Sequence, residues 1–369
     1  MQNPSGRQEA TRIAFLKESA WLRFSSPLFS QLLRAAAADA AMLELGSAGK
    51  PGQPVGLLFP TVAHFILLKS PDAHLAQYFP SVSAQPRPPE QAFPTFREFC
   101  LDNRREFAEL LSWRTVNTNL VERSSCILPA LAHVQVLTRQ PLRLVEICCS
   151  SGLNLLFDQY HYDYGPAGTL GNDGATIRLS CKLIGPARPP LDSIPEVVDR
   201  VGVDLVTIDA SDPLERLWME AALCPEWIEE RERLRAALAV RAAHHGRMLK
   251  GDALAILPGL FDELPGPVCV LHTYSMGQWS TEAWERLDHA MRRASRNRDI
   301  HRITIDFAEQ ERPEWVRTRL AHLAAAGIPL LQKSFPSRME HTWYARENAQ
   351  TRTLAQSDGF GAWLDWQAE

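Results

Sequence analysis

The sequence predicts an α/β protein, in which an all-helical region precedes a mostly parallel sheet of about seven strands. From residue 142 onward, short apolar runs alternate with segments of helical spacing, whereas the first 138 residues carry helical patterning alone. Two strand-like runs near the C-terminus, residues 329–335 and 341–346, are joined by a short turn segment that favours an antiparallel hairpin. Strands that alternate with helices build a parallel sheet through right-handed crossovers.

The N-terminal region is predicted to be helical throughout residues 1–138. Ser26 and Pro27 form an N-cap and first-turn pair for a helix that Gly46 ends. Two short helices are expected within residues 59–79, and two more at 95–113 and 119–136. The proline-rich stretch 80–94 between these pairs predicts a linker or an extended surface arm.

Residues 142–164 predict a strand, a tight turn and a helix, and this unit is the expected centre of the fold. The apolar run that contains Glu146 leads into the small residues Ser150, Ser151 and Gly152, and helical spacing follows. Such a junction directs backbone N–H groups at the space above the carboxyl end of the strand. In an open α/β sheet this position is a natural ligand site.

The rest of the chain continues the alternation and defines the second predicted domain, residues 139–369. An insertion rich in glycine and proline is expected at about 165–199, with one short strand candidate at 176–181. The predicted strands are 201–209, 267–274 and 302–307, and the predicted helices begin at Pro213 and Ser280 and span 313–327.

Composition excludes several classes of function. The formal net charge of −4 argues against nucleic acid or an anionic membrane as the main partner and favours a small-molecule substrate. The seven cysteines show no CxxC spacing, so neither a disulfide framework nor a metal site is expected. No signal peptide is recognised, and the longest apolar stretch, 55–68, is too short to span a bilayer, so we expect a cytoplasmic protein. The sequence does not predict the oligomeric state.

The run VEICCSSGLNLLFD, residues 145–158, followed by the Y-x-Y pattern of Tyr160 and Tyr162, resembles a bacterial family catalogued as a domain of unknown function. Members of that family carry a motif of the type VEIGASAGLNLLLD. The resemblance covers most of the chain and brings no established activity. It implies a fold similar to that of class I S-adenosylmethionine (SAM) dependent methyltransferases, which agrees with the predicted strand pattern.

The methyltransferase resemblance implies a SAM site at the carboxyl edge of the sheet. A glycine-rich turn would correspond to Ser150, Ser151 and Gly152, although Cys148 and Ser150 replace the usual glycines. The acid before the turn would be Glu146, which is costly in a buried strand unless it is paired. For the other cofactor contacts the resemblance points to Asn154, to Asp204 or Asp209 at the ribose, and to Asp252 and Ala253 at the adenine. Each of these residues also has a plain alternative as a turn or cap residue.

The function expected from this resemblance is SAM-dependent methyl transfer to a small-molecule acceptor. Methyl transfer needs alignment and desolvation, and a general base only where the nucleophile carries a proton. His272 and Tyr274 end the strand that would face the substrate, so they are the candidate bases; a structural role is the alternative for His272.

Two other functions fit parts of the sequence. An α/β-hydrolase would use Ser150 as nucleophile with Asp306 and His341, but the glycine before the serine and the oxyanion loop are missing. A Rossmann-like binding protein without catalytic activity would account for the replaced glycines.

Overall fold

The computed structural model of the chain describes residues 4–244, 246–275, 279–307 and 336–368. Its residues group into two compact units, one of Met1–Asn119 with Ser211–Arg235 and one of Leu120–Ala210 with Ala236–Glu369. The second unit includes the last helix before the first strand, α7 (Ser124–Thr138). None of the described helices combines the length and apolarity that crossing a bilayer requires.

The first unit is helical, as the sequence predicts for the N-terminal region. Its centre is an aromatic cluster in which the ring centroid of Phe59 lies 4.8 Å from those of both Phe15 and Phe107. Ser26 caps α2 as predicted, because its hydroxyl accepts a hydrogen bond from Phe29 N. The helices are α1 (Pro4–Leu22), α2 (Pro27–Ala36), α3 (Ala40–Gly46), α4 (Val55–Lys69), α5 (Phe93–Asp102), α6 (Arg104–Trp113), α8 (Pro213–Ala221) and the start of α9 (Ile228–Ala243).

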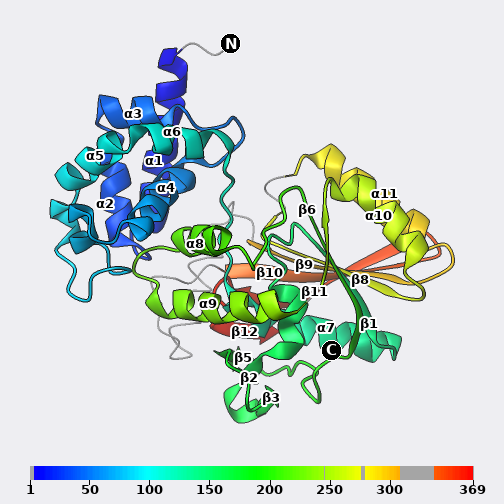
Figure 1. Cartoon of the computed structure of the whole chain (residues 1–369). Helices are drawn as coiled ribbons and strands as arrows, with labels where there is room; N and C mark the ends of the chain where they lie inside the picture. Colours follow the sequence, from blue (N-terminus) through cyan, green and yellow to red (C-terminus); the bar gives the residue numbers. More distant parts are fainter. Residues whose placement is uncertain (1–3, 245, 276–278, 308–335, 369) are drawn as a thin grey trace. The chain divides into compact units, whose positions relative to one another are not determined.

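The second unit is built on one large, mostly parallel sheet (Figure 1). In the described part this sheet has nine strands in the order β5-β12-β11-β10-β9-β8-β1-β6-β7, where about seven were expected. Strands β12 and β5 pair in parallel at one edge of the sheet. The strands are β1 (Leu142–Ile147), β5 (Lys182–Ile184), β6 (Val197–Asp204), β7 (Arg247–Lys250), β8 (Val268–Thr273), β9 (Ile300–Phe307), β10 (Pro336–Ala345), β11 (Asn348–Asp358) and β12 (Trp363–Trp366).

Helices α10 (Ala253–Glu263) and α11 (Thr281–Ala294) cover one face of this sheet, and α7 lies on the other (Figure 1). Val145 and Ile147 of β1 belong to the buried core that α10 and α11 complete with Leu257 and Leu287. Because successive side chains of a strand point to opposite faces, Glu146 lies on the face away from α10 and α11.

The segment after the central turn differs from the predicted helix. It forms a short 3-10 helix, η4 (Asn154–Gln159), with a kink at Leu156, and then a small sheet of β2 (His161–Asp163), β3 (Thr169–Gly171) and β4 (Arg178–Ser180). The physical reason is the run of alternate tyrosines, whose spacing suits a strand. Tyr160, Tyr162 and Tyr164 are all buried, and each hydroxyl donates to a backbone carbonyl.

The C-terminal hairpin also has different limits. Strand β10 contains the predicted run 341–346 only as far as Ala345, and it pairs antiparallel with β9 and with β11. Arg346 and Glu347 form the turn with φ of 49° and 64°, which is the left-handed pair that a tight hairpin requires. The strand predicted at 329–335 and the helix predicted at 313–327 lie outside the described residues.

Candidate functional site

The turn after β1 has a left-handed backbone at every second residue. Cys148, Ser150 and Gly152 have φ of 57°, 54° and 73°. This conformation is ordinary for glycine and costs roughly 1–2 kcal/mol per residue where a side chain is present. The first two positions are those where the sequence departs from the glycine-rich pattern, so the turn keeps a glycine-like path although it carries cysteine and serine.

Glu146, just before this turn, is a buried acid with half of its carboxylate free. The side chain is 2% exposed; its Oε1 accepts a 2.7 Å hydrogen bond from Asn154 Nδ2, and Oε2 has no partner among the described residues. Burial raises the pKa of Glu146 to about 8, the amide of Asn154 opposes this shift, and the charge of Asp204 adds to it. A cationic group placed beside Oε2 would lower this pKa and take the place of the proton.

Asp204, at the end of β6, ties three strand ends together. Its Oδ2 accepts a 2.7 Å hydrogen bond from Ser150 N, and its Oδ1 accepts one of 2.9 Å from Val206 N. Its own carbonyl accepts a hydrogen bond from Gly251 N at 2.8 Å, just after β7. Leu205 and Val206, which follow it, are 68% and 44% exposed. The carboxyl ends of β1, β6 and β7 are therefore drawn together beside a small exposed apolar surface.

The remaining residues predicted to bind the cofactor differ in their exposure and in their hydrogen bonds. Asp209 is exposed and lies beyond the end of β6, in the loop where Ile208 N donates to Ser150 O. Asp252 caps α10 by accepting a hydrogen bond from Leu254 N at 2.9 Å, and Ala253 is part of the core. Ser151 is fully buried, its Oγ has no partner in the described structure, and its carbonyl accepts a hydrogen bond from Arg241.

His272, the first candidate base, is enclosed on the α11 face of the sheet. Its Nε2 lies 3.0 Å from the Thr304 hydroxyl, and its ring centroid lies 5.0 Å from that of Trp284. Burial and the nearby charge of Arg302 lower the pKa of His272 to about 3. The structure thus separates His272 from Glu146, which lies on the other face, and leaves the histidine a weak base.

Tyr274 directly follows β8, and its ring stacks against the guanidinium of Arg123. It has a φ of 54°, its hydroxyl donates to Ser337 Oγ at 3.0 Å, and Arg123 lies 4.0 Å above its ring. Burial raises the pKa of Tyr274, and the positive charge of Arg123 only partly opposes this. A neutral phenol that donates to a hydroxyl can position a substrate but cannot readily remove a proton at neutral pH.

The sequence matches, over residues 12–366, the family described as uncharacterized protein conserved in bacteria (DUF2332). The chain belongs to this family. The bacterial family of unknown function expected from the sequence motif is thereby confirmed. No curated protein matches the chain.

Sequence reasoning missed the residues that hold the segment after the turn in place in this DUF2332 chain. The Tyr160 hydroxyl donates to Leu153 O at 2.8 Å, next to Asn154. Arg200 donates to Leu155 O at 2.8 Å and pairs with Asp158 through both of its terminal nitrogens. The alternate tyrosines were visible as a pattern, but nothing in the sequence indicated which backbone carbonyl each hydroxyl would reach.

The residues of the hydrolase alternative have other contacts in this DUF2332 chain. His341 Nε2 lies 3.0 Å from His301 Nδ1, and the two rings stack at 5.2 Å. The ring of His133 packs against His341 at 5.4 Å. No group of three histidine, cysteine or acidic side chains in the described chain is arranged to hold a metal ion.

Proposed function

We propose that this protein binds SAM at the carboxyl edge of β1 and transfers its methyl group to a small-molecule acceptor. The observation that carries the proposal is the turn 148–152, which begins two residues after the buried acid Glu146 and has left-handed φ at three alternate positions. This backbone path lets a ligand approach the main chain closely, as a glycine-rich turn does.

The strand order supports a ligand at this place. In the order of the sheet, β6 and β7 lie on one side of β1, and β8 and β9 lie on the other side. All four pairings among these strands are parallel, so their carboxyl ends meet at one edge. The point between β1 and β8 is a topological switch point, where open α/β sheets bind ligands. The antiparallel β10 beside β9 is the further feature shared with the methyltransferase layout.

The residues at this edge fit the parts of SAM. Glu146 Oε2, buried and without a partner in the described chain, would receive the ammonium group, with Asn154 holding the other oxygen. Asp204 retains lone pairs on both carboxylate oxygens for the ribose hydroxyls. The exposed side chains of Leu205 and Val206 would contact the adenine ring. Ser150, Ser151 and Gly152 would form the turn around the amino acid part.

The chemistry that SAM supplies when bound is an electrophilic methyl group on a sulfonium. The protein's own contribution is alignment and the exclusion of water. With His272 enclosed and its pKa lowered, the residues at the carboxyl edge of β8 suit an acceptor that needs little help in losing a proton. Tyr274 would then orient the acceptor, and its hydroxyl already donates to Ser337.

Calorimetric titration with S-adenosylhomocysteine (SAH) at pH 7, in buffers of different ionisation enthalpy, tests this proposal. Glu146 is mainly protonated at pH 7, so docking of an ammonium group beside it releases a proton, and the measured heat depends on the buffer. In Glu146→Gln we expect weaker binding and no proton release. Absence of binding at 1 mM SAH, on the order of the weakest relevant affinity, would leave the proposal without support.

A further inference from the structure

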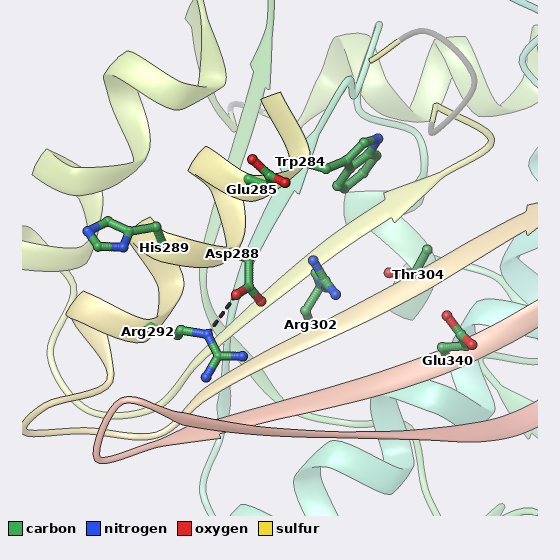
Figure 2. A pocket seen from close by; sticks show the side chains of 8 residues that line it. All are labelled: Trp284, Glu285, Asp288, His289, Arg292, Arg302, Thr304 and Glu340. Atoms are coloured by element: carbon green, nitrogen blue, oxygen red, sulfur yellow. Dashed lines mark hydrogen bonds and ion pairs between the residues drawn. The ribbon is translucent and has the colours of Figure 1, made fainter. Parts of the chain in front are cut away.

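A cavity of about 500 Å³, with charged residues in its lining, lies between α11 and the sheet. Helix α11 contributes Trp284, Glu285 and Asp288, β9 contributes Arg302, and β10 contributes Glu340 (Figure 2). The volume is within the range of small-molecule sites. Arg302 rises from the middle of β9, on the face that α11 covers, whereas Glu146 lies on the opposite face.

Arg302 carries a charge that the described residues leave without an ion pair. Its Nη2 donates to Thr342 Oγ1 at 3.2 Å, and its guanidinium carbon lies 5.7 Å from the centroid of the Tyr344 ring. Its Nε is buried and has no acceptor in the described chain. A partly buried guanidinium without a carboxylate is costly, which favours an anionic group as its partner.

The carboxylates around the cavity differ in whether they already form hydrogen bonds or ion pairs. Asp288 accepts hydrogen bonds from Arg292 Nε at 2.6 Å and from the Tyr344 hydroxyl at 2.9 Å. Glu340 lies 3.1 Å from Arg338 Nε. Glu285, by contrast, forms no hydrogen bond or ion pair with any described residue. Among the described residues, the cavity therefore offers one cation, Arg302, and one carboxylate, Glu285, that have no ion pair.

Trp284 gives this cavity a flat apolar wall. Its ring centroid lies 5.0 Å from that of Trp279 and 5.0 Å from that of His272, so neighbouring rings hold the indole in place. A rigid aromatic surface beside one cation and one carboxylate suits a zwitterionic ligand with an apolar or aromatic side chain.

We propose that this cavity binds a small zwitterion of the amino acid class, with its carboxylate on Arg302, its ammonium on Glu285 and its side chain against Trp284. The carboxylate and the ammonium would each meet a charged group that has no ion pair among the described residues, and the side chain would meet the face of the indole. The site uses none of the residues proposed to hold SAM, so it goes beyond the proposed function and does not depend on it.

Thermal denaturation of the full chain with L-phenylalanine at 10 mM tests the proposal. The matched controls are 3-phenylpropanoate, which lacks the ammonium group, and 2-phenylethylamine, which lacks the carboxylate. We expect a rise in melting temperature of roughly 2 °C or more for the amino acid and a clearly smaller one for either analogue. A panel of other free amino acids tests which side chain the cavity prefers. In the same panel, 5-aminovalerate tests a wider separation between the ammonium and the carboxylate.

Arg302→Met should remove the stabilisation by the amino acid and leave any stabilisation by SAH unchanged. Arg286→Gln, on the same helix but outside this cavity, serves as the matched control and should retain both effects. If Arg302→Met fails to fold, the panel on the unaltered protein still decides. The proposal is overturned if no zwitterion stabilises the protein, if 3-phenylpropanoate does so equally well, or if binding survives in Arg302→Met.

Discussion

The turn after β1 and the cavity beneath α11 lie on one sheet, but different chemical groups form them. The turn offers backbone in a left-handed conformation and one enclosed acid, and its geometry depends on hydrogen bonds to residues such as Tyr160 and Asp204. The cavity offers the ends of long charged side chains on a regular helix and strand. Changes at the turn should therefore alter folding stability and pH dependence, whereas changes in the cavity should alter ligand binding alone.

Glu146→Gln should give the largest effect on stability. The pKa of Glu146 rises from its ordinary value of 4.5 to about 8 in the folded chain, so the folded protein holds this proton more tightly than the unfolded one does. The stability that this tighter proton binding contributes is fully present below the pKa of Glu146 in the unfolded chain, and it is lost as the pH rises toward 8. We expect the unaltered protein to lose on the order of a few kcal/mol between pH 5 and pH 8 through this residue.

Urea denaturation at pH 5, 6.5 and 8 measures this slope. Glu146→Gln should flatten it and gain relative stability at pH 8, because a neutral amide replaces a buried charge. Glu285→Gln, which removes a carboxylate of the cavity, should keep the slope. Equal slopes in the unaltered protein and in Glu146→Gln would mean that the acid is not held protonated.

Glycine substitutions in the turn should have opposite signs at adjacent residues. Cys149 has an ordinary φ and is buried, so Cys149→Gly should lower the free energy of unfolding by about 2 kcal/mol. Cys148→Gly relieves the cost of a left-handed side chain, partly offset by the freedom of glycine in the unfolded chain, and should change stability by between zero and about +1 kcal/mol. Denaturation curves of both variants in parallel provide the measurement, and a loss at Cys148 as large as that at Cys149 would contradict the left-handed backbone.

Tyr160→Phe should cost about 1 kcal/mol, because it leaves the buried Leu153 carbonyl without its donor. Tyr162→Phe removes a similar hydrogen bond to Phe157 O and should cost about the same. Only Tyr160→Phe should also change the pH slope assigned to Glu146, since Leu153 adjoins Asn154. Urea denaturation at two pH values separates the two variants; identical slopes would show that Tyr160 does not position the acid.

Glu285→Gln should have the smallest effect on stability, within about 0.5 kcal/mol, because the side chain has no partner among the described residues. Binding of L-phenylalanine should nevertheless weaken severalfold, as its ammonium group loses a carboxylate. Titration of the variant with the amino acid, alongside its melting curve, checks both parts. A large loss of stability would show that Glu285 has a structural role instead.

Much of the architecture follows from local patterns. The helical N-terminal region, the buried strand 142–147 with its turn, and the strands near 201, 268 and 302 are all visible as apolar periodicity. The helix predicted after the turn is only a short 3-10 helix, because the alternate tyrosines that follow favour a strand and their hydroxyls bind backbone carbonyls of Leu153, Phe157 and Ser125. Strand β11 was missed because its polar first half, from Asn348 to Arg352, gives no apolar signal and is held by pairing with β10.

The sequence by itself determined the α/β class, the family, and the position of an acid and small residues at the end of the first strand, because each depends on residues adjacent in the chain. Only the tertiary structure decided the state of those residues. Burial raises the pKa of Glu146, strand pairing places His272 on the opposite face, and Arg302 has no ion pair among the described residues. Solvation and charge pairing depend on what surrounds a side chain in space, and segments far apart in the sequence supply those surroundings.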